Sequence, residues 1–149
     1  LDLKNLTKKL KLNSQILKEN DLINPETEIL IINSFGVLPE YFSYCKNIFI
    51  GKSFIKKKKS VGGQNPIEAA KLGCRVFHGP YVYNFQEVYD LLSSYGVAEE
   101  INNEKELAKK LIKNFGNPII EGQKQINLLN SYGERILKET ALEIDLYLK

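Results

Sequence analysis

The residues best suited to chemistry form one short stretch, in which two glycines precede the predicted start of a helix. Glycines there let the backbone approach a ligand closely, and the free N–H groups and helix dipole favour a phosphate. Glu68, at the third predicted helical position, could accept hydrogen bonds from ribose hydroxyls. Spacing alone favours a simpler structure, a capping box in which Glu68 reaches back to the Asn65 N–H. The stretch is Gly62-Gly63-Gln64-Asn65-Pro66-Ile67-Glu68.

Three further groups of small or polar residues directly follow predicted strands. Ligands of open parallel α/β sheets bind beyond the carboxyl ends of the strands, so these groups could line one crevice. Strand ends need turn residues in any case, and the pattern leaves both interpretations open. The groups are Asn33-Ser34-Phe35-Gly36, Gly51-Lys52-Ser53 and Gly79-Pro80.

Four other features allow a functional and a structural interpretation. Asn84 could face a donor sugar or only cap the following helix. The lysine run 56–59 could attract an anion, although a solvated charge run is the commoner explanation. His78, the only histidine, has no partner at triad spacing, and we treat it as a strand-end residue. Tyr81 and Tyr83 could stack on a base, whereas packing in a wall is the simpler expectation.

The elements that must position these residues alternate between short apolar runs and helical patterns. This alternation predicts an α/β fold with a Rossmann-like open parallel sheet and helices on both faces. The run 28–32 is apolar throughout and predicts a strand buried on both faces, whereas residues 14–17 fit a strand or a loop. We expect the other strands at 47–50, 75–78 and 97–99. We expect helices at 1–11, 38–45, 66–72, 85–94, 104–115 and from about 118 onward.

Composition limits the classes of function. The 149 residues, 43% hydrophobic, suit one globular domain, and a net charge of +3 is far from a nucleic-acid-binding signature. Cys45 and Cys74 lack zinc-ligand spacing and fit a reducing compartment better than a disulfide scaffold. No apolar run approaches the ~20 residues that span a bilayer. Composition and cysteine spacing therefore disfavour a zinc site and a nucleic-acid partner, and we expect no cofactor.

The motifs, taken in order, resemble those of the 3-deoxy-D-manno-octulosonic acid (Kdo) transferases. That family carries strings close to T-x-G-E, G-G-S, G-G-H-N-P-x-E and G-P-x-x-x-N-F, and residues 28–95 match them densely. The set with its spacing is specific, although each motif alone is not. The resemblance implies that the matching positions bind the donor CMP-Kdo. They are Ser34, Gly36, Gly51, Ser53, Gly62, Gly63, Asn65, Glu68, Asn84 and Phe85.

The resemblance also implies a GT-B glycosyltransferase that uses CMP-Kdo without a metal. The family transfers Kdo to a lipid A precursor at the cytoplasmic face of the bacterial inner membrane, in lipopolysaccharide synthesis. Its catalytic carboxylate belongs to an N-terminal domain that matches nothing here, so we nominate no catalytic residue. We expect residues 1–149 to be the C-terminal donor-binding domain, without its first strand segment and the acceptor domain, and inactive alone.

Four departures from the family pattern keep other functions open. Val37 replaces a glutamate, Lys52 replaces a glycine, Gln64 replaces a histidine, and the lysine run is unusually basic. One alternative is the donor domain of another GT-B transferase that uses a UDP- or GDP-sugar. A second is a degenerate module that binds an anionic membrane surface or a partner protein.

Overall fold

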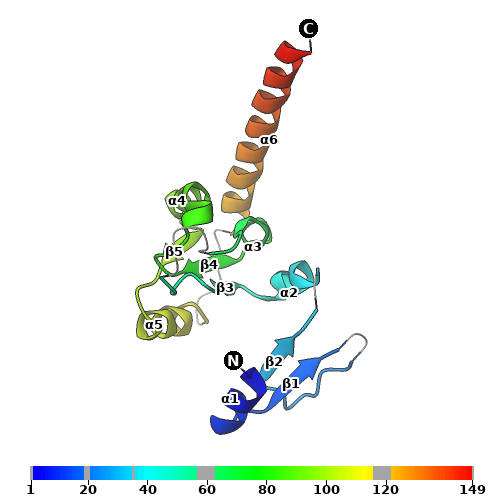
Figure 1. Cartoon of the computed structure of the whole chain (residues 1–149), viewed down its shortest axis with the longest axis vertical. Helices are drawn as coiled ribbons and strands as arrows, with labels where there is room; N and C mark the ends of the chain where they lie inside the picture. Colours follow the sequence, from blue (N-terminus) through cyan, green and yellow to red (C-terminus); the bar gives the residue numbers. More distant parts are fainter. Residues whose placement is uncertain (1, 19–20, 35, 57–62, 116–121, 149) are drawn as a thin grey trace. The chain divides into compact units, whose positions relative to one another are not determined.

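The computed structural model describes residues 2–18, 21–34, 36–56, 63–115 and 122–148. The chain divides into two compact units, Leu1–Leu38 and Pro39–Lys149. Each unit contains parallel strands connected through helices or loops (Figure 1). Residues 57–59 of the lysine run 56–59, and Gly62, lie outside the described residues.

The first unit contains helix α1 (Leu3–Lys9) and strands β1 (Ser14–Leu17) and β2 (Ile29–Ile32). The Asp2 carboxylate caps α1 by accepting hydrogen bonds from the Lys4 and Asn5 N–H groups. β1 and β2 pair in parallel, which settles the open assignment of residues 14–17 as a strand. The prediction that β2 is buried on both faces is wrong. Its residues are half-buried or exposed, because β1 is its only partner among the described strands.

The second unit is built on a three-stranded parallel sheet in the order β3-β4-β5. Its strands are β3 (Asn47–Ile50), β4 (Arg75–His78) and β5 (Ala98–Glu100). Its helices are α2 (Leu38–Tyr44, which begins at the unit boundary), α3 (Ile67–Lys71), the 3-10 turn η1 (Tyr83–Phe85), α4 (Gln86–Ser94), α5 (Glu104–Phe115) and α6 (Gly122–Tyr147). The parallel α/β architecture that the sequence predicts is therefore confirmed.

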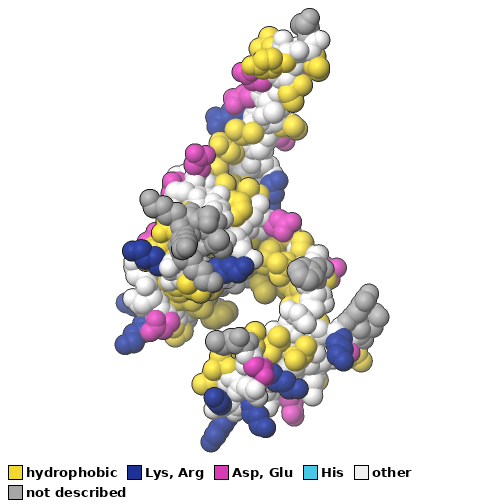
Figure 2. Space-filling view, viewed as in Figure 1, with side chains coloured by type: hydrophobic (Ala, Val, Ile, Leu, Met, Phe, Trp, Pro, Cys, Tyr) yellow, Lys and Arg dark blue, Asp and Glu magenta, His cyan; other side chains and the backbone are white. Residues whose placement is uncertain are grey.

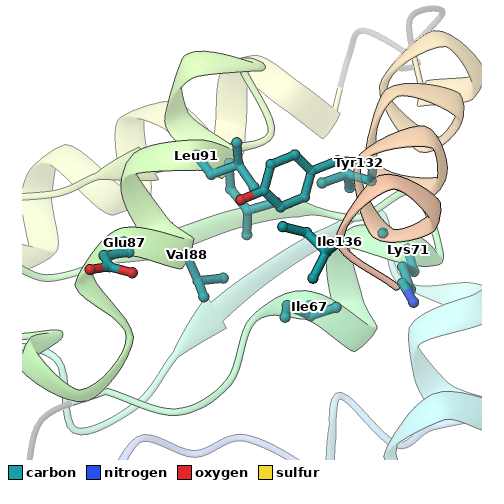
Figure 3. Close-up of a pocket in the computed structure, with 10 residues that line it drawn as sticks. Ile67, Lys71, Glu87, Val88, Leu91, Tyr132 and Ile136 are labelled. Carbon is teal, nitrogen blue, oxygen red and sulfur yellow. The ribbon is translucent and has the colours of Figure 1, made fainter. Parts of the chain in front are cut away.

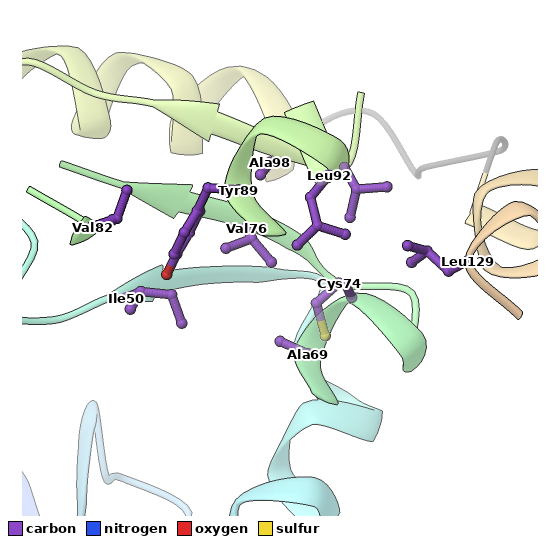
Figure 4. Packing of buried hydrophobic residues seen from close by; sticks show 11 residues of the cluster. Ile50, Ala69, Cys74, Val76, Val82, Tyr89, Leu92, Ala98 and Leu129 are labelled. Carbon is purple, nitrogen blue, oxygen red and sulfur yellow. The ribbon is translucent and has the colours of Figure 1, made fainter. Parts of the chain in front are cut away.

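Helices cover both faces of this sheet, as expected. Val76 and Phe77 are adjacent in β4, point to opposite faces, and are both fully buried. The Val76 face packs against α3, α4 and α6, each fully buried side chain contributing ~1.5–3 kcal/mol. Figure 4 shows this cluster, which consists of Ile50, Ala69, Ala70, Cys74, Val76, Val82, Tyr89, Leu92, Val97, Ala98 and Leu129.

Helix α5 covers the opposite face of the sheet. Lys110 pairs with Glu99, which neighbours Phe77 across the β4-β5 ladder. Asn114 accepts a hydrogen bond from Arg75 at the start of β4. The expected apolar side of α5 is only partly used, since Ile112 and Phe115 are 74% and 78% exposed.

The last helix, α6, packs on the core only near its N-terminal end. Leu129 is buried in the cluster, whereas most side chains beyond Ile136 are exposed. Figure 2 shows hydrophobic side chains along this helix. Its exposed hydrophobic residues include Leu137, Leu142, Ile144 and Leu146. None of the helices within the described ranges is both long and apolar enough to cross a membrane.

Candidate functional site

The candidate site lies where β3 and β4 end, at the carboxyl edge of the three-stranded sheet. Ile50 and His78 are partners in the register, so both strands end side by side. The two turns that follow are residues 51–54 and 79–82. The parallel register therefore brings Gly51-Lys52-Ser53 and Gly79-Pro80 together at one edge of the sheet.

Ser53 joins the two turns. Its Oγ donates to the Ile50 carbonyl oxygen (2.6 Å) and accepts from the Gly79 N–H (2.8 Å). Its own carbonyl oxygen accepts from the Tyr81 N–H (2.9 Å). Ser53 is fully buried, so any effect of this side chain on a ligand would act through the turns that it holds.

Gly79 is required because the Ser53 backbone lies too close to leave room for a side chain, and its own backbone dihedral angle φ is ordinary. A Cβ atom at this position would lie 2.4 Å from the Ser53 carbonyl oxygen and 2.5 Å from Phe54 Cδ1. Gly51, in the facing turn, has open space within 4 Å of its Cβ position. The turn at Gly51 is therefore accessible, whereas the junction at Gly79 is tightly packed.

Residues 63–65, which precede α3, are held at the same edge of the sheet by Tyr89 and Val82. The Tyr89 hydroxyl donates to the Gln64 carbonyl oxygen (2.9 Å), and a Cβ on Gly63 would lie 3.1 Å from Val82 Cγ1. Gly63 also has φ +70°, which favours glycine. Burial raises the pKa of the Tyr89 phenol, which is protonated at neutral pH and donates this bond. Residues 63–65 therefore lie beside residue 82, next to the turn that follows β4.

The predicted capping box at the start of α3 does not form. The Asn65 Oδ1 accepts from the Ile67 N–H (3.0 Å), but Pro66 occupies the N-cap position and Glu68 is only the second helical residue. Because the helix starts one residue later than expected, Glu68 lies outside the N3 position that reaches back to the cap. The Glu68 side chain is exposed, and no described residue donates a hydrogen bond to it. Its carboxylate is therefore open to solvent and to a ligand.

Asn84 and Phe85 lie in η1, which corrects the predicted cap. The Phe85 N–H donates to the Val82 carbonyl oxygen (2.8 Å), forming a 3-10 turn that moves the N-cap position of α4 from Asn84 to Phe85. Phe85 is half-buried and packs against the core, whereas Asn84 is exposed. Asn84 can therefore reach a ligand, and Phe85 supports the turn that presents it.

The remaining predicted positions cannot be compared with this edge. Ser34 and Gly36 belong to the first unit, where both are exposed and Gly36 has φ +79°. Gly62 lies outside the described residues. The second unit therefore brings together six of the predicted positions and holds them around the ends of β3 and β4. They are Gly51, Ser53, Gly63, Asn65, Asn84 and Phe85, and Glu68 follows as the second residue of α3.

Two buried side chains at this edge, Tyr89 and His78, make contacts that the sequence did not predict. In the sequence, Tyr89 fits the pattern of an ordinary core residue of an amphipathic helix. Its hydrogen-bond partner is 25 residues earlier in the chain, so neighbouring residues give no sign of the contact. His78 is 3% exposed and its ring lies 4.3 Å from the Tyr89 ring, centroid to centroid. Its Nδ1 contacts the Gly79 carbonyl oxygen (2.8 Å), and its Nε2 has no partner in the described chain. A lone histidine at a strand end was the only available signal.

A separate apolar groove of about 280 Å³ lies between α3, α4 and α6 (Figure 3). Leu91, Tyr132 and Ile136 form much of its wall, and Lys71 lies at its rim. None of the predicted site residues that the structure describes lines it. No group of three His, Cys, Asp or Glu side chains in the described ranges is placed to hold a metal ion.

Comparison with known proteins finds similar sequences among enzymes that share one name. No protein-family model matches the chain. It is 31% identical to the 3-deoxy-D-manno-octulosonic acid transferase of Aquifex aeolicus, over 59% of this chain and 24% of that protein. It is 24% identical to the enzyme of the same name from Haemophilus influenzae, over 80% of this chain and 26% of that protein. The chain thus spans about a quarter of the length of these curated relatives.

A solved structure supplies the corresponding fold. The C-terminal CMP-Kdo binding domain of WaaA from Acinetobacter baumannii superposes with a TM-score of 0.72 at 17% identity. The match covers 87% of this chain and 65% of that one. The predicted α/β fold and the resemblance to the Kdo transferases in sequence are both confirmed.

Proposed function

We propose that this chain, which resembles the Kdo transferases in sequence and shares the fold of a CMP-Kdo binding domain, binds CMP-Kdo as the donor domain of such an enzyme. The names of the relatives support the substrate class. The observation that carries the proposal is the convergence of residues 51–53, 63–65 and 79–81 at the carboxyl edge of one parallel sheet. Ligands of this fold class bind at that edge.

Within the proposed site, Glu68 binds the ribose. Its carboxylate is exposed and lacks a described partner, so it is free to accept hydroxyl hydrogen bonds. Asn65 uses its side-chain oxygen to fix the start of α3, and Tyr89 fixes the Gln64 carbonyl. The ligand therefore meets a backbone that is already ordered, which reduces the entropy lost on binding.

In the whole enzyme, the role of this domain is to position the donor. Held at the sheet edge, CMP-Kdo would present its anomeric carbon to an acceptor bound elsewhere, which we take to be a lipid A precursor at the inner membrane. Catalysis would then gain from orientation and from stabilising the departing phosphate. The proposal assigns no base, nucleophile or metal to this chain.

The test is a titration of the 149-residue chain with CMP, UMP and AMP, followed by amide NMR. We expect CMP-selective shifts at Gly63, Asn65 and Glu68, because these surround the proposed nucleotide site. Glu68→Ala should weaken CMP binding about tenfold, the loss expected for one hydrogen bond to a charged group. Glu134→Ala, an exposed glutamate on α6, is the matched control and should bind as the unmodified chain does.

Other outcomes would redirect the assignment. Shifts with UMP in preference to CMP would favour a donor domain that uses a UDP-sugar. Unchanged CMP affinity in Glu68→Ala would remove the ribose role of this residue. Binding to anionic liposomes without any nucleotide binding would favour a degenerate membrane-binding module.

A further inference from the structure

The turn after β3 holds a lysine in a backbone conformation that side chains rarely adopt. Lys52 has φ +63°, in the left-handed region where a Cβ crowds the neighbouring carbonyl. Glycine would adopt the same conformation without that cost. The chain therefore keeps a side chain where a residue without one would be more stable. Such strain clusters at ligand-binding sites, and at Lys52 it coincides with an exposed cation at the end of a strand.

The surrounding hydrogen bonds fix the backbone from which Lys52 extends. Ser53, the next residue, is fully buried and bonds to both the Ile50 carbonyl oxygen and the Gly79 N–H. Gly79 packs directly against the Ser53 carbonyl. The backbone of Lys52 therefore lies next to a hydrogen-bonded contact between the ends of β3 and β4, and its side chain extends from that contact into solvent.

The Lys52 ammonium also lacks a counter-charge in the part of the chain that the structure describes. The side chain is exposed, and none of the ion pairs among the described residues includes it. The same sheet edge carries residues 63–65, which the Tyr89 hydroxyl and Val82 hold in place. An unpaired cation thus stands on a strained and rigid turn beside the proposed nucleotide site.

We propose that Lys52 is a donor-binding residue whose ammonium holds an anionic oxygen of the nucleotide sugar. The inference rests on the proposed function, because CMP-Kdo supplies two such groups, the phosphate and the carboxylate of the sugar acid. A lysine binds either group as a point charge. Because the contact is exposed, salt should weaken it.

Two substitutions separate the charge of Lys52 from its backbone strain. Lys52→Gln removes the charge and leaves a side chain in the left-handed region, whereas Lys52→Gly removes both. Lys11→Gly is the matched control, since Lys11 is also an exposed lysine with positive φ (+56°) but follows α1 in the first unit. Lys52→Arg keeps the charge. Calorimetry with CMP, CMP-Kdo and cytidine measures affinity, and thermal unfolding measures stability.

We expect both charge-removing variants to bind CMP about tenfold more weakly, which corresponds to ~1.4 kcal/mol. Their cytidine affinity should not change, because cytidine lacks both anionic groups. If the contact is to the carboxylate, only CMP-Kdo binding weakens. Lys52→Gly should melt at or above the temperature of the unmodified chain, and Lys11→Gly should bind normally. Lys52→Arg should stay within about threefold of the unmodified chain, as one charged contact replaces another.

The negative outcomes are distinguishable. Normal CMP and CMP-Kdo binding by both Lys52→Gln and Lys52→Gly would overturn the inference and leave the proposed function intact. An equal loss of cytidine binding would also overturn it, because that loss cannot arise from an anionic contact. If the unmodified chain binds neither CMP nor CMP-Kdo, the proposed function fails and the inference fails with it.

Discussion

Replacing Gly79 by alanine tests whether the junction between the two turns is as tightly packed as the structure indicates. The added Cβ would lie 2.4 Å from the Ser53 carbonyl oxygen and 2.7 Å from the Ser53 carbonyl carbon. Both are backbone atoms, so no side-chain rotation can relieve the clash. The two turns must separate.

The cost can be worked out from the contacts that such a separation breaks. Overpacking a well-packed site costs ~1–3 kcal/mol. Separation also breaks the hydrogen bonds from the Gly79 N–H to Ser53 Oγ (2.8 Å) and from the Tyr81 N–H to the Ser53 carbonyl (2.9 Å), each worth ~1 kcal/mol. We therefore expect Gly79→Ala to lower the free energy of unfolding by about 3–5 kcal/mol.

The assay is urea unfolding followed by amide NMR signals of β4, which report on this sheet directly. Gly51→Ala is the matched control, because its Cβ would meet no atom within 4 Å, and it should change stability by less than ~0.5 kcal/mol. Ser53→Ala perturbs the same junction less severely and should cost ~1–3 kcal/mol by leaving the Gly79 N–H unpaired. A Gly79→Ala variant within ~1 kcal/mol of the unmodified chain would refute the reasoning.

Three further predictions follow from other contacts. Tyr89→Phe removes the hydrogen bond to the Gln64 carbonyl and should lower the free energy of unfolding in urea by ~1 kcal/mol. Tyr44→Phe, at a side chain that is 86% exposed, should leave it almost unchanged, and equal effects of the two substitutions would contradict the anchoring role of Tyr89. Gly133→Ala, within α6 and with open space at its Cβ position, should raise the free energy of unfolding by ~0.5–1 kcal/mol, and a loss in thermal unfolding would reveal crowding in the apolar groove. Burial raises the pKa of the Cys74 thiol from 9.0 to about 11, so its contribution to stability is complete below pH 9.0 and is lost as the pH rises towards 11. Urea midpoints across this range should fall less steeply in Cys74→Ala, and parallel slopes would argue against that contribution.

Sequence patterns formed by neighbouring residues predicted most helices and strands of the second unit well. The apolar runs that became β3 and β4, and the 3.6-residue periodicity that became α5, gave the observed boundaries. The order of the glycine, proline and asparagine motifs also pointed to the correct family of folds. These signals are local, and each can be read without knowing what packs against it.

Features that depend on distant parts of the chain could not be predicted in the same way. The exposure of β2 depends on which strands flank it, and its apolar sequence says nothing about that. The bond from the Gly79 N–H to Ser53 Oγ joins positions 26 residues apart, so the structural role of Ser53 could not be predicted from its neighbours in the sequence. The start of α3 moved by one residue, which was enough to exclude the capping box at Glu68.

The composition of β5 has a consequence for how the chain avoids self-assembly. β5 is an edge strand of the described sheet, and an open edge offers unpaired backbone groups to any other extended chain. Only three residues long, it carries Glu100 and Glu99, the latter paired with Lys110, so a second β5 brought alongside would gain only a very short ladder next to charged side chains. Replacing both glutamates by valine would turn this edge into a template for intermolecular strand addition. The short ladder and its two charged side chains thus disfavour edge-to-edge association of the chain.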